Sequence, residues 1–254
     1  MFKLVRIGVL LLILVVVAGD AWLTGLRNTD WDIPLEVVIY PVNGDGSEET
    51  ASYIADLEDD VFRPVARYLA SEGAAYQVEL LTPVTVVLAS EVVSQPPPAP
   101  FNGSVLKIMF WSLKLRWWAW RVDTYDGPTD IRIFVLYFDP ARYKNLGHSL
   151  GLKEGRLCLV KAFADYQYAA RNNVIITHEL LHTLGATDKY DPETGQPFFP
   201  DGFADPDRTP LYPQIQAEIM GGLIPESEEN GKMPDGLGWT VIGSLTAGEI
   251  GWTE

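Results

Sequence analysis

The hydrophobic pattern along the chain predicts an early group of strands. Runs rich in β-branched and aromatic residues, bounded by turn-forming residues, indicate strands at residues 34–42, 78–90, 130–140 and 155–165. The proline-rich residues 94–100 form a stiff loop, because proline lacks the backbone N–H that a strand donates. Strands followed by a long helix that carries polar residues predict an α/β or α+β arrangement of layers.

Apolar residues that recur every three or four positions predict helices in the remaining segments. Residues 47–72 carry such a stripe, and Pro64 is expected to kink or divide this helix. Residues 166–185 are expected to form a helix of about five turns, with Gly185 as its C-terminal stop. The stretch TAGE at residues 246–249 matches a capping box and predicts a short terminal helix.

Residues 104–121 have the sequence SVLKIMFWSLKLRWWAWR, which contains four tryptophans. On a helix, Lys107, Lys114 and Arg121 lie near one stripe, and the rest of the surface is almost wholly apolar or aromatic. We expect a helix that is buried on most of its sides. The alternative is a basic, tryptophan-rich face that contacts an anionic membrane surface.

Composition and charge narrow the class of protein. The 254 residues are 47% hydrophobic and 21% charged, as in an ordinary globular domain. The formal net charge of -15 argues against a nucleic-acid partner, because phosphate binding depends on clustered lysine and arginine. The single cysteine, Cys158, excludes an internal disulfide and is predicted to be an inert thiol in a buried strand.

The N-terminus predicts export across a membrane. Lys3 and Arg6 precede an apolar run at residues 7–19, and Asp20 follows it. Residues 1–26 are therefore expected to be either a cleaved signal peptide or an uncleaved signal-anchor, and we favour the anchor. The rest of the chain would then lie on the extracytoplasmic side, attached to the membrane through this segment or secreted.

The stretch HELLHTLGATD carries the chemistry of a metal site. His178 and His182 are four residues apart and project from the same face of a helix, as two ligands of one zinc ion would. Glu179 lies beside them and is suited to accept a proton from water without binding the metal. Gly185 allows the chain to turn back, which brings the carboxylate of Asp188 within reach as a third ligand.

This pattern resembles the metzincin zinc proteases, whose signature is HExxHxxGxx followed by a ligand. An aspartate in place of the usual third histidine is similar to the snapalysin variant, and the stretch GATDKYD is also similar to proteases of the immune-inhibitor-A type. Met220, in the stretch EIMGG, is in a suitable context for the Met-turn of these enzymes, and Met233 is a less convincing candidate. The likeness is confined to residues 172–222.

The resemblance implies an α+β, zincin-like domain with a mixed twisted sheet and an active-site helix. Residues 27–254 would form a single metalloprotease-like domain. Its N-terminal subdomain (27–185) would carry the helix, and a smaller irregular subdomain (186–254) the Met-turn. The implied activity is zinc-dependent hydrolysis of a protein or peptide substrate with Glu179 as general base.

Other residues leave alternatives open. The hydroxyl of Tyr190 could stabilise the oxyanion or serve a packing role, and Glu218 could replace Asp188 as third ligand, as in glutamate-type zincins. A non-catalytic exported zinc-binding protein is the alternative outside enzymes. His148 is expected to be an ordinary loop residue. Structural calcium is the alternative to a solvated loop for the acidic residues Asp191, Glu193, Asp201, Asp205 and Asp207.

Overall fold

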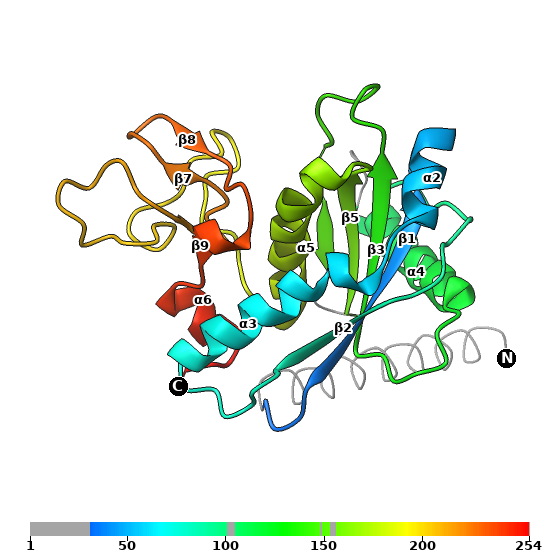
Figure 1. The fold of residues 1–254 in the computed structure, drawn as a ribbon, viewed down its shortest axis with the longest axis horizontal. Coiled ribbons are helices and arrows are strands. Elements are labelled where there is room, and N and C mark those ends of the chain that lie inside the picture. Colours follow the sequence, from blue (N-terminus) through cyan, green and yellow to red (C-terminus); the bar gives the residue numbers. More distant parts are fainter. Residues whose placement is uncertain (1–30, 101–104, 148, 153–155, 254) are drawn as a thin grey trace, which may run out of the picture.

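The computed structural model describes residues 31–100, 105–147, 149–152 and 156–253, which form a mixed α+β fold around a five-stranded sheet (Figure 1). The strand order is β2-β1-β3-β5-β4. The first four of these strands are parallel, whereas β4 pairs with β5 in the antiparallel sense and forms an edge. The bounds are β1 (Leu35–Asn43), β2 (Val84–Leu88), β3 (Ile131–Phe138), β4 (Leu150–Leu152) and β5 (Leu157–Phe163).

All four predicted strands are present, and β1, β3 and β5 lie close to their predicted bounds. Their nearly continuous apolar sequences reflect burial on both faces of a mostly parallel sheet. β2 is shorter than predicted and begins directly after Pro83, which has no N–H to donate. β4 was not predicted, because three residues are too few to show a period.

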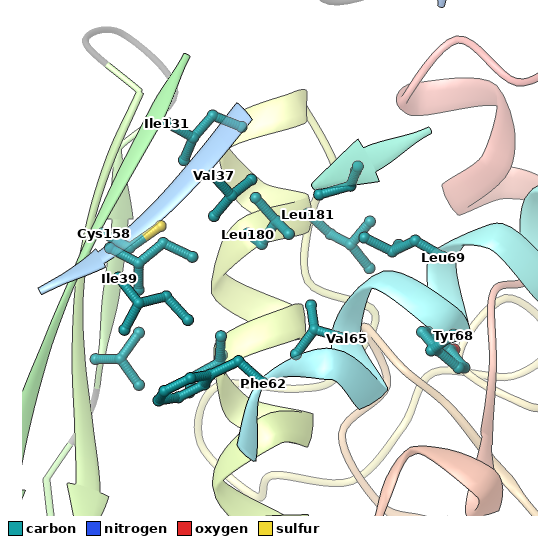
Figure 2. Packing of buried hydrophobic residues seen from close by; sticks show 14 of the residues in the cluster. Val37, Ile39, Phe62, Val65, Tyr68, Leu69, Ile131, Cys158, Leu180 and Leu181 are labelled. Atoms are coloured by element: carbon teal, nitrogen blue, oxygen red, sulfur yellow. The ribbon is translucent and has the colours of Figure 1, made fainter. Parts of the chain in front are cut away.

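Helices cover both faces of the sheet. Helices α2 (Glu48–Ala55), α3 (Arg63–Ala75) and α5 (Ala169–Leu184) contribute to the core on one face, and α4 (Val105–Val122) covers the other (Figure 1). Figure 2 shows the core between the sheet and helices α3 and α5, in which side chains of β1 and β3 point towards Leu180 and Leu181 of α5. The helix that carries the metal-site motif is therefore fixed directly on the sheet.

The predicted helix at residues 47–72 is divided, as Pro64 suggested, but the division lies before the proline. Ser47 caps α2 by accepting a hydrogen bond from the backbone N–H of Thr50 at 3.2 Å. A 3₁₀ turn, η1 (Asp59–Val61), separates α2 from α3. Pro64 lies in the first turn of α3, where a missing N–H leaves no hydrogen bond unmade.

The expectation that the helix at residues 104–121 is buried on most sides was wrong. α4 buries one face, with Leu115, Trp118 and Ala119, against β1 and β3. Large apolar side chains on its opposite face are exposed, among them Phe110 and Trp120. The pattern could not show this, because α4 is apolar on both faces and only the fold decides which of them is covered.

The membrane segment predicted at residues 1–26 lies outside the described residues, as does His148. In the part of the chain that the structure describes, no helix combines the length and the hydrophobicity needed to cross a bilayer. Cys158 lies in β5 and is fully buried, as predicted. Its burial raises the pKa of the thiol well above the ordinary value, which suits an inert packing residue.

Helix α5 begins slightly later than predicted, because residues Tyr166–Tyr168 form a 3₁₀ turn, η2. Its first turn is anchored to the sheet: the side-chain amide of Asn172 donates to the carbonyl of Phe163 at 2.9 Å and accepts from its N–H at 3.2 Å. Asn173 donates to the carbonyl of Val61 at 2.7 Å. These contacts fix the position of the helix before the motif begins.

Residues 186–253 contain only short regular elements, beside the outer side of α5 (Figure 1). The strands β6 (Ala217–Glu218) and β9 (Thr240–Val241) pair, as do β7 (Ile224–Pro225) and β8 (Gly231–Lys232); η3 (Leu237–Trp239) and α6 (Ser244–Glu249) complete the segment. The terminal helix is confirmed, but the capping box was wrong, because Gly243 is the N-cap of α6 and Thr246 lies inside it.

Candidate metal centre

The ends of three side chains meet at the C-terminal part of α5. His178 and His182 lie one helical turn apart, and their Nε2 atoms are separated by 3.1 Å. Gly185 then ends the helix in the left-handed conformation, with φ of 115°. The chain turns back and brings Oδ1 of Asp188 to 3.2 Å from both histidine Nε2 atoms. The three residues that the sequence suggested as ligands are therefore brought together.

The dimensions of this group fit a small tetrahedral ion. Zinc holds nitrogen and oxygen ligands at about 2.0–2.2 Å, which places neighbouring ligand atoms about 3.3 Å apart. The three separations between His178, His182 and Asp188 are 3.1, 3.2 and 3.2 Å. Three ligands on one face leave a fourth position open. Among the described residues, this group has the side chains and spacing that could hold a metal ion.

Backbone carbonyls orient both imidazole rings. Nδ1 of His178 lies 2.9 Å from the carbonyl oxygen of Ile219, and Nδ1 of His182 lies 2.8 Å from that of Ala186. Because a carbonyl oxygen only accepts, each Nδ1 carries its proton and donates it. Each Nε2 of the neutral ring then presents a lone pair to the common point, which is the arrangement that supports metal-ligating histidines.

The electrostatics of the group favour a cation. Burial by itself would raise the pKa of Asp188, but when no metal is bound and the rings are protonated at Nε2, hydrogen bonds from His178 and His182 outweigh it and hold this pKa well below its usual range. Burial would lower the pKa of His182, yet its contact with Asp188 raises it overall. In the absence of a metal, the anionic carboxylate therefore attracts positive charge to the point where the three ligand atoms meet.

Glu179 lies beside the three ligands without joining them. Its side chain is 7% exposed and lines the same cavity of about 330 Å³ as His178, His182 and Asp188. Burial raises the pKa of this carboxyl, while the two histidines lower it and Asp188 raises it further. A carboxylate with a raised pKa accepts protons more readily than an ordinary one, as a general base requires.

Tyr190 contacts the third ligand. Burial, the charge of Asp188 and the polar interaction of the hydroxyl with the same carboxylate raise the pKa of Tyr190 to about 12. The Tyr190 ring also lines the cavity, with its centroid 6.4 Å from that of His178. Tyr190 thus lies beside the third ligand, and its predicted role in stabilising an oxyanion stays a prediction.

The proposed Met-turn lies next to the first ligand in the structure. Met220 is completely buried in the core beside α5, and the preceding residue, Ile219, supplies the carbonyl that orients His178. The turn is closed by the N–H groups of Gly221 and Gly222, which donate to the carbonyl of Glu218 at 2.9 and 3.1 Å. The turn therefore fixes the ring of His178 through its backbone.

Glu218 is not placed as a third ligand. Its Oε2 accepts from the N–H of Gly221 at 2.8 Å, and its Oε1 accepts from the N–H of Gly243 and the hydroxyl of Thr246, at 3.1 and 2.7 Å. The structure therefore gives no support to the alternative in which Glu218 replaces Asp188. This fully buried carboxylate instead connects the turn at Met220 to α6, although its burial raises its pKa.

A second connection from α6 holds the loop of the third ligand. Glu249 accepts from the N–H of Thr187 at 2.9 Å and from the Nζ atom of Lys189 at 2.6 Å. Asp188 lies between these two residues. Sequence analysis missed this contact, because nothing in the local pattern distinguishes a buried lysine such as Lys189 from an exposed one.

The edge strand β4 forms one wall of the site. Ser149, Leu150 and Gly151 line the cavity, and the backbone N–H of Gly151 acts on the carboxylate of Glu179 by lowering its pKa. A Cβ atom on Gly151 would lie 2.7 Å from the carbonyl oxygen of Glu179 and 2.8 Å from Cβ of His182. Only glycine allows β4 to approach α5 this closely, and no sequence signal identified it.

The acidic residues of the loop after the helix do not converge. Asp191 accepts from the N–H of Glu193 at 2.7 Å within its own turn. Within the described ranges, the five acidic side chains named above for calcium form no cluster comparable to the metal centre. The arrangement gives no support to a structural calcium ion.

Comparison with known proteins adds no family assignment. No protein-family model matches the chain, and no curated protein gives a significant match. The geometry of the site therefore carries the functional argument, and the chain is described by its α+β fold and its cluster of His178, His182 and Asp188.

Proposed function

We propose that this protein is a zinc-dependent endopeptidase of the zincin type, with His178, His182 and Asp188 as ligands. The observation that carries the proposal is the near-equilateral triangle of their ligand atoms, with both histidines oriented by backbone carbonyls. A structural zinc site is normally closed by four protein ligands, whereas three leave one position for substrate or water. This favours a catalytic site.

The chain's own groups suit hydrolysis of a peptide bond. Zinc, when bound, would polarise the scissile carbonyl and make water a stronger acid. Glu179 is the base beside this position: it takes a proton from the attacking water as the new C–O bond forms and delivers it to the leaving amine as the C–N bond breaks. The backbone N–H of Gly151 lies near this carboxylate and favours its charged form.

Two surfaces beside the ligands favour an extended peptide as substrate. β4 is an edge strand that borders the cavity, so a peptide could add to its unpaired edge as a further strand. A second cavity, of about 530 Å³, begins at His178 and Glu179 and is lined largely by apolar residues. Among these are Val174, Ile175 and Leu223. We therefore propose cleavage next to a bulky apolar side chain.

The predicted location is part of the proposal. The charge pattern of residues 1–26 favours export, with the metal centre on the extracytoplasmic side and the chain tethered to the membrane if the segment is retained. Tyr190, through the interaction of its hydroxyl with Asp188, is proposed to keep the carboxylate aimed at zinc.

The deciding experiment compares wild type with Glu179→Gln for zinc content and for cleavage of a peptide library. We expect both proteins to hold one zinc ion and the variant to lose about 10²–10⁴-fold in activity, the range that a general base contributes. Glu193→Gln, at an exposed position, is the matched control and should behave as wild type. A wild type that holds zinc but cleaves nothing would favour the non-catalytic zinc-binding alternative.

A further inference from the structure

The outward face of α4 is the largest group of exposed apolar side chains on one helix in the described residues. Phe110 and Trp120 are each 72% exposed, although large aromatic side chains are usually covered. At 100° per residue, six of these exposed side chains lie opposite the face that packs on the sheet, whereas the exposed Ile108 lies in line with the buried Leu115. The residues of the outward face are Leu106, Met109, Phe110, Leu113, Trp117 and Trp120.

Basic residues run along one border of this face. Lys107, Lys114 and Arg121 are seven residues apart, so their side chains form a row beside the apolar stripe. No acidic residue occurs in Val105–Val122, although the whole chain has a formal net charge of -15. The guanidinium of Arg121 lies 5.5 Å from the ring centroid of Trp117, which joins the charged border to the aromatic stripe.

We propose that this face of α4 lies on a membrane surface that contains anionic lipids. Tryptophan rings prefer the boundary between headgroups and acyl chains, and the long side chains of Lys107, Lys114 and Arg121 reach the lipid phosphates. A second copy of the chain fits this face less well, because the copy would offer basic residues and no acidic residue of α4 to pair with them. Charge complementarity therefore selects lipid as the partner.

The position of α4 in the fold suits such contact. Its buried residues Leu115 and Trp118 pack in one core with Val38 and Tyr40 of β1. β1 begins at Leu35, and the eight residues 27–34 that precede it span at most about 28 Å. A membrane segment at residues 1–26 would therefore keep α4 near the lipid.

The metal centre lies across the sheet from α4. Helix α5 belongs to the core on one face of the sheet, and α4 belongs to the core on the other (Figure 1). Contact between α4 and lipid therefore leaves the cavity at His178 and His182 uncovered. The proposed membrane contact uses a different surface from the proposed active site, so it can be tested independently of catalysis.

The test uses the full chain reconstituted in bilayer nanodiscs with and without anionic lipid. A nitroxide spin label is placed at Leu113→Cys on the exposed face, and its collisions with dissolved oxygen and with a water-soluble nickel complex are compared. The native Cys158 is fully buried and does not compete for the label. Ile215→Cys, at a side chain that is 58% exposed far along the chain, is the matched control.

In anionic bilayers we expect the label at residue 113 to favour oxygen over nickel, as lipid-exposed labels do, and the label at residue 215 to favour nickel. Lys107→Gln, Lys114→Gln and Arg121→Gln together should return the label at residue 113 to the level of the control. Nickel access at residue 113 equal to that at residue 215 would overturn the proposal. Shielding of residue 113 from both reagents would also overturn it, since a protein partner or a second copy would then cover the face.

Discussion

Nδ1 of His178 lies 2.9 Å from the carbonyl oxygen of Ile219, a residue 41 positions later in the chain. The carbonyl accepts the Nδ1 proton, so the lone pair of Nε2 points to Asp188 and His182. The turn that follows β6 therefore sets the direction of the first ligand, although the ligand itself belongs to α5. The helix supplies the spacing of the histidines, and the C-terminal segment supplies their orientation.

The assignment of the third ligand predicts different outcomes for two acidic residues. Loss of a residue that only supports a metal ligand weakens metal binding by up to about 100-fold. Asp188→Ala removes a direct ligand and should therefore weaken zinc binding by more than about 100-fold. Glu218→Ala should keep one zinc ion but lose about 1–3 kcal/mol of unfolding free energy, since it leaves buried donors without an acceptor. Metal analysis with a competing chelator and urea unfolding would measure both effects. The assignment fails if Glu218→Ala loses zinc while Asp188→Ala retains it.

The close approach of β4 to α5 predicts that Gly151→Ala is damaging. Its Cβ would lie 2.7 Å from the carbonyl oxygen of Glu179, so β4 must move away, at a cost of about 1–3 kcal/mol in unfolding free energy. Peptidase activity should fall as well, because the added Cβ would also lie 3.1 Å from Oε2 of Glu179 and displace its carboxylate. Gly238→Ala is the control, since nothing lies within 4 Å of the added atom. Wild-type stability and activity in Gly151→Ala would contradict the tight contact.

The contact between Glu249 and Lys189 predicts a non-additive pair of substitutions. Glu249→Gln leaves the ammonium of Lys189, whose side chain is 5% exposed, without its charged partner and should cost about 3 kcal/mol of unfolding free energy. Lys189→Met combined with Glu249→Gln should cost less than the sum of the two single changes, because no unpaired charge remains. Urea unfolding of the four proteins gives the coupling, with Glu228→Gln as an exposed control. Strict additivity would show that the pair does not interact.

The same contact predicts a dependence of stability on pH. Burial would raise the pKa of Glu249, but hydrogen bonds from Lys189 and Thr187 outweigh it and lower this pKa below the ordinary value of 4.5. The carboxylate therefore stabilises the fold fully above pH 4.5, and this contribution is lost as the pH falls through the lowered pKa. The difference in unfolding free energy between wild type and Glu249→Gln should shrink on acidification. A difference that stays constant over the acid range would rule out this linkage.

Several features follow from the sequence because they depend on neighbouring residues. The i, i+4 spacing of His178 and His182 places them on one face of any helix. Gly185 allows the left-handed turn that returns the chain, and Asp188 then lies within reach. The strands β1, β3 and β5 were likewise visible as apolar runs with strong β propensity.

Other features were decided by tertiary structure, since they join residues that are far apart in the chain. The carbonyl that orients His178, the contact of Glu249 with Lys189 and the wall formed by Gly151 all come from other elements. A single sequence does not show which polar group lies opposite another. The role of Glu218 was not visible in the sequence for the same reason. Two of the three donors to its carboxylate, Gly243 and Thr246, come from the distant segment at α6.

Helix α4 shows most clearly which features the sequence determines and which the tertiary structure decides. Its sequence determines a helix that is apolar on both faces, with a basic row at Lys107, Lys114 and Arg121. The hydrophobic pattern by itself cannot say how many faces are covered, because burial depends on which elements pack against the helix. The fold covers the face of Leu115 and Trp118 and leaves Phe110 and Trp120 exposed. The sequence thus determined the local chemistry of both the metal ligands and this helix, and tertiary packing decided which groups meet and which remain on the surface.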